Sequence, residues 1–264
     1  METVTSQDGT TIAYETSGSG PVLLLVAGAL TGRVEMRPLA EALSDDFTVV
    51  NFDRRSRGES NDAQTVFPDS PDREIEDIQA LIERFGEPFH LYGHSSGAAL
   101  ALHAAARTNP ARLVLHEAPY HPDSAPPDAG IGGFGNDLKA LFEQGDYEGS
   151  VILFFKSGGI TDEQIDEMKA GDDWSRWVDK GRALAYDSTA MGDRSGGRIP
   201  DDRLSDITCP TLTLAGSETY ENLVEVSRVL AGKLPDAEFL MVGGANHESG
   251  PDLIAPPVRD FLLG

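Results

Sequence analysis

The chain has 264 residues, of which 39% are hydrophobic and 25% are charged. This length fits one globular α/β unit with room for an insertion, and it allows a core large enough to fold without disulfides. The one cysteine, Cys209, cannot form a disulfide within the chain. Composition therefore excludes a disulfide-rich secreted domain and a cysteine-rich zinc module.

Charge excludes further classes of partner. The chain carries 44 acidic and 21 basic residues, a net charge of −23, which would repel nucleic acid and anionic membranes. The first residues show no signal-peptide pattern, and the longest aliphatic run, at 22–27, is far shorter than the ~20 residues of a membrane span. We expect a soluble, cytoplasmic protein without nucleic-acid or membrane partners, and the sequence leaves the oligomeric state undefined.

Short apolar runs alternate with longer amphipathic segments up to residue 116, which is the pattern of parallel strands joined by helices. The run at 22–27 is aliphatic throughout, as expected of a strand buried on both faces. Asp8-Gly9 supplies a tight turn between the first two strands. The predicted strands are 4–6, 11–15, 22–27, 47–52, 89–92 and 112–116, and the predicted helices are 35–43, 73–85 and 96–107.

The alternation stops at Pro119 and resumes at Pro210. A linker rich in proline and glycine follows Pro119, and helical stretches are predicted after it. These stretches lie at about 136–148, 161–169 and 173–187. The later elements are predicted as strands 211–215 and 238–242, a helix at 221–230 and a last helix from about 253.

The chain thus predicts an α/β fold in which a mostly parallel, eight-stranded sheet is flanked by helices and interrupted after the sixth strand by a helical insertion. We assign 1–120 and 206–264 to the sheet-bearing core and 121–205 to the insertion. The insertion is expected to cover the carboxyl ends of the strands, where open α/β sheets bind ligands.

A serine stands on a predicted sharp turn between a strand and a helix. The sequence Gly-His-Ser-Ser-Gly at 93–97 fits the G-x-S-x-G pattern, with strand 89–92 before it and helix 96–107 after it. The turn forces Ser95 into a strained backbone conformation, and the flanking glycines avoid the clashes that a Cβ would cause. Ser95 is therefore the candidate nucleophile, with the first amides of the helix aimed at an oxyanion.

A serine hydroxyl needs a base that takes its proton. Of the six histidines, His247 lies in a predicted loop after the last strand, which opens at the same edge of the sheet as Ser95. His94 lies within the turn and points away from Ser95 in this prediction. His247 is thus the candidate base.

These motifs resemble the α/β-hydrolase superfamily over nearly the whole chain. The resemblance rests on the turn at 93–97, the segment Asp-Arg-Arg-Ser-Arg-Gly-Glu-Ser at 53–60 and the His247 loop, with serine before histidine along the chain. It implies acyl-transfer chemistry by a Ser–His–acid triad. It also implies that residues about 120–205 form a mobile cap that selects substrates.

The triad acid departs from the commonest pattern of this superfamily. Thr219 occupies the usual position of the acid, and threonine has no charge that stabilises an imidazolium. Some members carry the acid after the sixth strand, where Glu117 stands, and the segments 95–98 and 116–119 are similar to those of zearalenone lactonase. We expect Glu117 to be the acid, because a carboxylate at a buried strand end needs a partner. The alternatives are Glu218, Glu221 and a purely structural role for Glu117.

The resemblance implies an oxyanion hole made of two backbone amides. One is the amide of Ser96, and the other is the amide of Ala29 or, as an alternative, of Leu30, in a loop that lacks the His-Gly of many relatives. Trp174 and Trp177 share one face of a predicted helix, and they either pack the insertion or line the pocket. The candidate substrate contacts are Leu30, Tyr120, Trp174 and Trp177.

Two further patterns point to neither a cofactor nor a metal ion. Residues 130–135 satisfy G-x-G-x-x-G, but they follow a proline-rich stretch instead of a strand, so we expect a hinge of the insertion there. His116, Glu117 and His121 lack the spacing of metal ligands. We expect that the protein uses no cofactor and no metal.

The sequence predicts a serine hydrolase that cleaves a carboxylic ester or lactone through an acyl-enzyme on Ser95, with a small-molecule substrate that the sequence does not name. Two alternatives on the same fold stay open. One is a non-hydrolytic, cofactor-free enzyme such as a biosynthetic cyclase or a perhydrolase, and the other is a non-enzymatic ligand receptor.

Overall fold

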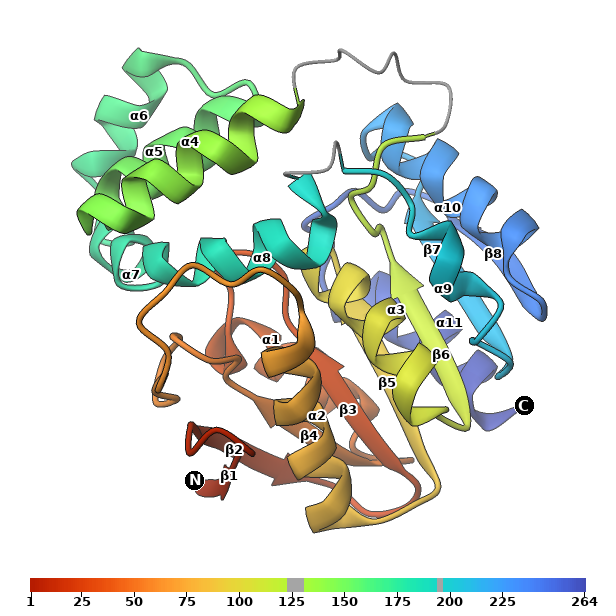
Figure 1. Ribbon diagram of the computed structural model, residues 1–264. Helices are drawn as coiled ribbons and strands as arrows, with labels where there is room; N and C mark the ends of the chain where they lie inside the picture. Colours follow the sequence, from red (N-terminus) through yellow and green to blue (C-terminus); the bar gives the residue numbers. More distant parts are fainter. Residues whose placement is uncertain (123–130, 194–196) are drawn as a thin grey trace.

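The computed structural model describes residues 1–122, 131–193 and 197–264, whose arrangement Figure 1 shows. Eight strands form one sheet in the order β1-β2-β4-β3-β5-β6-β7-β8. The pairs β1–β2 and β2–β4 are antiparallel and all other neighbours are parallel, which confirms the predicted sheet. The strands are β1 (Glu2–Thr5), β2 (Thr11–Ser17), β3 (Val22–Val26), β4 (Thr48–Phe52), β5 (Phe89–His94), β6 (Arg112–His116), β7 (Thr211–Gly216) and β8 (Ala237–Val242).

Helices cover both faces of the sheet because the central strands are apolar on both sides. In β3, Leu24 and Val26 belong to one apolar cluster, whereas Leu23 and Leu25 belong to another, as the alternation of side chains along a strand requires. Helices α2, α3 and α10 complete the first cluster, and α1 and α11 complete the second. Their bounds are α1 (Arg33–Leu43), α2 (Asp72–Phe85), α3 (Ser96–Thr108), α10 (Glu221–Lys233) and α11 (Pro251–Leu263).

The segment between β6 and β7 is helical and has an apolar cluster of its own. This cluster joins aromatic side chains of α4, α5 and α7 to Leu30 and Phe67. Helix α8 packs against α3 and lies at the end of the sheet to which the β6 arrow points (Figure 1). The helices are α4 (Ile131–Gln144), α5 (Tyr147–Ser157), α6 (Asp162–Lys169), α7 (Trp174–Asp179), the 3-10 helix η1 (Gly181–Ala183), α8 (Leu184–Met191) and α9 (Asp201–Leu204).

The helices of this segment differ from the prediction in four places, one of which is the short helix α9, which the prediction lacks. Helix α4 begins at Ile131, so the glycines within 131–135 are helical and not part of a hinge, while Gly130 lies outside the described residues. Helix α5 is absent from the prediction, because its apolar run at 151–155 has no helical period. The stretch predicted at 173–187 is divided into α7, η1 and α8.

The loops that follow the parallel strands meet at one edge of the sheet, because parallel strands share the direction of their carboxyl ends. This edge collects segments that lie far apart in the sequence. The loops after β3, β4, β5, β6, β7 and β8 begin at Ala27, Asp53, Ser95, Glu117, Ser217 and Gly243. No helix among the described residues combines the length and apolar character that a membrane crossing requires.

Candidate active site

Ser95 stands at the sharp turn between β5 and α3. Its φ of 55° lies in the left-handed region, which is strained for a residue that has a Cβ. The chain passes so closely that an added Cβ at Gly97 would lie 2.2 Å from the carbonyl oxygen of Val26. An added Cβ at Gly93 would lie 2.3 Å from the carbonyl oxygen of Gly97. Only glycine fits these two positions, and the glycines therefore permit the turn that presents Ser95.

Glu117 follows β6, and its fully buried side chain is surrounded by hydrogen-bond donors. The Gly216 amide donates to Oε1 at 2.8 Å, and Thr219 Oγ1 donates to Oε2 at 2.9 Å. His247 Nδ1 donates to the same Oε2 at 2.5 Å. Thr219 stands in the usual position of the acid. It donates to the carboxylate of Glu117, which follows β6, a different strand from the one before Thr219.

These donors decide the charge of Glu117. Burial by itself would raise the pKa of its carboxyl group, but the hydrogen bonds from His247 and the Gly216 amide outweigh burial and keep the pKa below its ordinary value. Glu117 is therefore a carboxylate near neutral pH. This carboxylate keeps a proton on Nδ1 of His247, so Nε2 of the neutral ring is a proton acceptor. The His247 side chain is 21% exposed, which leaves it open to solvent.

His94, the residue before Ser95, holds the His247 loop in place. Its Nε2 lies 3.1 Å from the carbonyl oxygen of His247, and Nε2 carries the proton because a carbonyl only accepts. The ring centroids of His94 and His247 are 4.7 Å apart, and those of His94 and His116 are also 4.7 Å apart. These contacts bring the loop that carries His247 against the turn that carries Ser95.

The loop after β3 lies against the same turn. An added Cβ at Gly28 would be 3.0 Å from the Cβ of Ser95. The Ser95 carbonyl accepts a hydrogen bond from the Ala98 amide at 2.8 Å, so the Ser96 N–H, across the same trans peptide, points out of the helix. The amides of Ala29 and Ser96 therefore belong to two segments that meet beside Ser95.

The family model described as "Alpha/beta hydrolase family" matches residues 23–256, which is most of the chain. The chain belongs to the alpha/beta hydrolase family. The resemblance expected from the turn at 93–97 is thus confirmed. The relatives described next are named as hydrolases, so the chain is an enzyme of the hydrolase class.

Three proteins show how this alpha/beta hydrolase compares with known chains. The crystal structure of an alpha/beta hydrolase from Sphaerobacter thermophilus DSM 20745 is 37% identical, with a TM-score of 0.86 over 99% of this chain and 100% of that one. The 2-(acetamidomethylene)succinate hydrolase of Mesorhizobium japonicum is 26% identical over 96% of this chain and 91% of its own length. The uncharacterized hydrolase YraK of Bacillus subtilis is 33% identical, but the match spans 36% of this chain and 35% of that protein.

The alternative acids of the alpha/beta hydrolase lie in a different setting from Glu117. Glu218 and Glu221 are both exposed, and Glu221 begins α10. In the part of the chain that the structure describes, Glu117 is the carboxylate that accepts the hydrogen bond from Nδ1 of His247. The geometry therefore joins Glu117, and neither alternative, to the candidate base.

The four candidate substrate contacts of the hydrolase lie in two places. Trp174 and Trp177 pack around Phe155, with ring centroids 6.4 Å and 5.1 Å from it, inside the apolar cluster of the insertion. Leu30 belongs to the same cluster and has a left-handed φ of 54°. Tyr120 is buried in the main core beside α3. The structure thus brings three of the candidates together and places Tyr120 apart from them.

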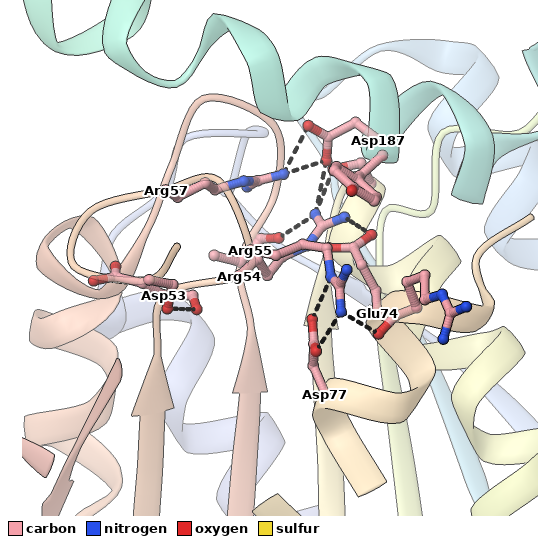
Figure 2. Close-up of polar contacts among 12 residues, drawn as sticks. Asp53, Arg54, Arg55, Arg57, Glu74, Asp77 and Asp187 are labelled. Atoms are coloured by element: carbon pink, nitrogen blue, oxygen red, sulfur yellow. Dashed lines mark hydrogen bonds and ion pairs between the residues drawn. The ribbon is translucent and has the colours of Figure 1, made fainter. Parts of the chain in front are cut away.

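A buried network of charges near this edge was missed by sequence reasoning (Figure 2). Arg54 binds Glu74 through Nε and Nη2, each at 2.7 Å, and binds Asp187 through Nη1 at 2.7 Å. Arg57 Nη2 donates to both oxygens of Asp187, at 2.6 and 2.7 Å. The cluster of arginines directly after a buried strand was a usable signal, because a charge there needs a counter-ion. No sequence pattern points to Asp187, which lies 130 positions from Arg57.

The neutral form of His94 predicts a specific pH dependence of stability. Burial, together with the nearby His247, lowers the pKa of His94 from 6.5 to about 4. The unfolded chain therefore takes up a proton that the folded chain refuses, so this contribution to stability is complete above pH 6.5 and is lost as the pH falls toward 4. Between pH 7.5 and 5, wild type should lose about 2 kcal/mol more unfolding free energy than His94→Gln does, as measured by urea unfolding. Equal losses in the two proteins would contradict this assignment.

Proposed function

We propose that this alpha/beta hydrolase cleaves a carboxylic ester or lactone through an acyl-enzyme on Ser95, with His247 as general base and acid and Glu117 as the triad acid. The observation that carries the proposal is the 2.5 Å hydrogen bond from His247 Nδ1 to Glu117, in a loop that is bound to the residue before Ser95. One nitrogen of the imidazole is held by a carboxylate, and the other is available to a serine hydroxyl.

Acylation follows from these positions. Ser95 Oγ forms a bond to the acyl carbon while His247 Nε2 takes the hydroxyl proton. The carbonyl electron pair moves to the oxygen, and the amides of Ser96 and Ala29 donate to the resulting oxyanion. The bond to the leaving alkoxide then breaks as His247 returns the proton to it. Glu117 stabilises the imidazolium that exists between these two proton transfers.

Deacylation repeats the same steps with water. His247 takes a proton from a water molecule, whose oxygen bonds to the acyl carbon of the acyl-enzyme. The bond to Ser95 Oγ then breaks, and His247 returns the proton to the serine. A simple ester yields a separate acid and alcohol, whereas a lactone yields one hydroxy acid.

We assign substrate selection to the insertion, 121–205, between the core parts 1–120 and 206–264. The support is that the apolar cluster of the insertion includes Ala29 and Leu30, so it adjoins the proposed oxyanion hole. Aliphatic and aromatic side chains at that place suit an apolar acyl group or alcohol.

One relative favours a second candidate, the hydrolysis of an N-acyl bond. The Mesorhizobium japonicum protein is named a 2-(acetamidomethylene)succinate hydrolase, and it matches 96% of this chain. The same residues serve this reaction, because His247 protonates a departing nitrogen as it does a departing oxygen. The two candidates therefore differ in the leaving group and share the nucleophile.

A fluorophosphonate probe tests the nucleophile directly. Ser95 Oγ should displace fluoride from the phosphorus and retain the phosphonyl group, which peptide mass spectrometry locates. Labelled protein should no longer hydrolyse p-nitrophenyl acetate. Labelling at another residue, or full activity after labelling of Ser95, would contradict the proposal.

Matched substrate pairs separate the two candidates. Phenyl acetate and acetanilide share an acyl group, and δ-valerolactone and δ-valerolactam share a ring size. We expect the higher kcat/KM for the ester and the lactone. A preference for the amide or the lactam would transfer the assignment to N-acyl hydrolysis, with the roles of Ser95, His247 and Glu117 unchanged.

A further inference from the structure

Each proposed oxyanion donor is the N–H of a peptide group whose C=O already accepts a hydrogen bond. The N–H of Ala29 and the C=O of Gly28 belong to the same trans peptide and point in opposite directions. The direction of the Ala29 N–H is therefore set by whatever holds the Gly28 carbonyl.

A buried arginine holds it. Arg57 Nη1 donates to the carbonyl oxygen of Gly28, and it donates to that of Thr31 at 2.9 Å. Thr31 Oγ1 also donates to the Gly28 carbonyl, at 2.8 Å, but this bond lies within the loop itself. In the described residues, Arg57 is thus the group from outside the loop that holds the Gly28 carbonyl.

The position of Arg57 depends in turn on a residue of the insertion. Asp187, on α8, accepts both hydrogen bonds from Arg57 Nη2 and is 1% exposed (Figure 2). The same carboxylate accepts a hydrogen bond from Ser96 Oγ at 2.6 Å. Ser96 supplies the other proposed oxyanion donor, so Asp187 is bound directly to one segment of the hole and, through Arg57, to the other.

Arg54 adds a second cation to this arrangement. Its Nη1 donates to the carbonyl oxygen of Ala27 at 3.0 Å and to Asp187 at 2.7 Å. Burial would raise the pKa of Asp187, but the charges of Arg57 and Arg54 outweigh burial and keep the pKa below its ordinary value. Asp187 therefore remains a carboxylate, and the two guanidinium groups keep a buried counter-ion.

A cation on one side of a peptide also changes the other side. A charge-assisted hydrogen bond to the Gly28 carbonyl draws electron density toward its oxygen and makes the Ala29 N–H a stronger donor. Such a donor acts most strongly on a developing negative charge, which exists in the transition state and not in the bound ester. Loss of this bond should therefore lower kcat and leave KM nearly unchanged.

We propose that Arg57, held in place by Asp187 of α8, is a positioning residue of the oxyanion hole, which orients and polarises the peptide that presents the Ala29 amide. This inference rests on the proposed function. It assigns a role in the reaction to one charged pair, which joins the insertion to the core.

The test compares two arginines that are equally buried. Arg55 lies in the same loop, is fully buried and forms its ion pairs with Asp77, Asp8 and Asp62, without a hydrogen bond to the carbonyls of 27–31 in the described residues. Arg57→Lys and Arg55→Lys each keep the positive charge and lose the planar guanidinium group.

Both variants should lower the melting temperature. With p-nitrophenyl acetate, Arg57→Lys should lower kcat about 10- to 100-fold at a KM within about threefold, since loss of a whole oxyanion donor costs roughly 10²–10³. Arg55→Lys should keep the wild-type kcat.

An inhibitor that forms an oxyanion distinguishes weaker stabilisation of the oxyanion from a general loss of structure in the variant. Ser95 Oγ adds to the carbonyl carbon of 2,2,2-trifluoroacetophenone and gives its proton to His247, and the carbonyl electron pair moves to the oxygen to leave a tetrahedral alkoxide. Its inhibition constant should rise in Arg57→Lys by the same factor by which kcat/KM falls. Asp187→Asn, which keeps the size of the side chain, should shift both quantities in the same direction and serves if Arg57→Lys does not fold.

The outcomes distinguish this inference from the proposed function. If Ser95→Ala is inactive while folded Arg57→Lys and Asp187→Asn keep the wild-type kcat and inhibition constant, the positioning role is wrong and the function stands. Equal losses of kcat in Arg57→Lys and Arg55→Lys would also overturn the positioning role. If Ser95→Ala retains activity, the proposed function itself is wrong.

Discussion

Ser95→Ala should lower kcat for p-nitrophenyl acetate by about 10⁴- to 10⁶-fold, because the variant has no oxygen that can form the acyl-enzyme. The residual rate over water should come from the oxyanion donors and from substrate binding, which the substitution leaves in place. Alanine differs from serine by one oxygen atom, so it should keep the turn between β5 and α3. Pre-steady-state kinetics with excess substrate, which detect the p-nitrophenol burst of acylation, should show no burst.

The matched control is Ser157→Ala, the same substitution at an exposed serine at the end of α5. This variant should keep the wild-type kcat and burst. A Ser95→Ala protein with an unchanged melting temperature and an unchanged kcat would remove Ser95 from the reaction. Such a result would also remove the roles proposed for His247 and Glu117, since His247 takes the Ser95 proton and Glu117 stabilises the imidazolium that results.

Glu117→Gln should lower kcat by roughly 10³- to 10⁴-fold, which is the effect of an equivalent neutral substitution in a triad. Glutamine is close to glutamate in size, but its amide NH₂ would replace either Oε1, where it faces the fixed N–H of Gly216, or Oε2, where it faces Thr219 and His247. The first placement sets two donors against each other, so the second is favoured. An NH₂ group against Nδ1 forces the proton of the neutral imidazole onto Nε2. The ring would then present a donor to Ser95 and could not take its proton. Steady-state kinetics on p-nitrophenyl acetate measure this loss.

The controls for Glu117→Gln change either a different carboxylate or a donor to Glu117. Glu218→Gln and Glu221→Gln change exposed carboxylates and should leave kcat near wild type. Thr219→Ala removes one of the donors to Glu117 and keeps the carboxylate, so its effect should be small, about 1 kcal/mol or less in transition-state stabilisation. A large loss in Glu218→Gln together with a normal rate in Glu117→Gln would transfer the role of the acid to Glu218.

The sheet and its helices could be predicted because their signals are local. The aliphatic run of β3 and the apolar faces of α1 and α2 appear within a few residues, and each of these elements begins and ends close to its predicted bounds. The position of Glu117 could also be predicted, since it follows a buried strand. What surrounds Glu117 could not, because Gly216 and Thr219 lie 99 and 102 positions away.

The insertion and the arginine network were harder to predict for the same physical reason. Helix α5 is apolar over several successive residues, so its helical character depends on the neighbours that cover it and not on a period in its own sequence. The sequence around Arg54 and Arg57 does not show whether these side chains are solvated or form buried ion pairs. That decision depends on Asp187, whose place above the sheet follows from tertiary packing alone.

The bond between α8 and the loops of the core bears on how this enzyme can be recombined with its relatives. A chimera that exchanges the insertion from α4 up to η1 retains Asp187 and both of its arginines, and it alters the helices α4 to α7, to which we assign substrate selection. A crossover placed after α8 instead brings in a foreign helix. Unless that helix carries a matching carboxylate, Arg57 loses its counter-ion while Arg54 keeps Glu74, a defect of about 3–5 kcal/mol. A crossover that exchanges the insertion between homologues is therefore best placed at 180–183. This point lies before α8, which is bound to the core through Asp187.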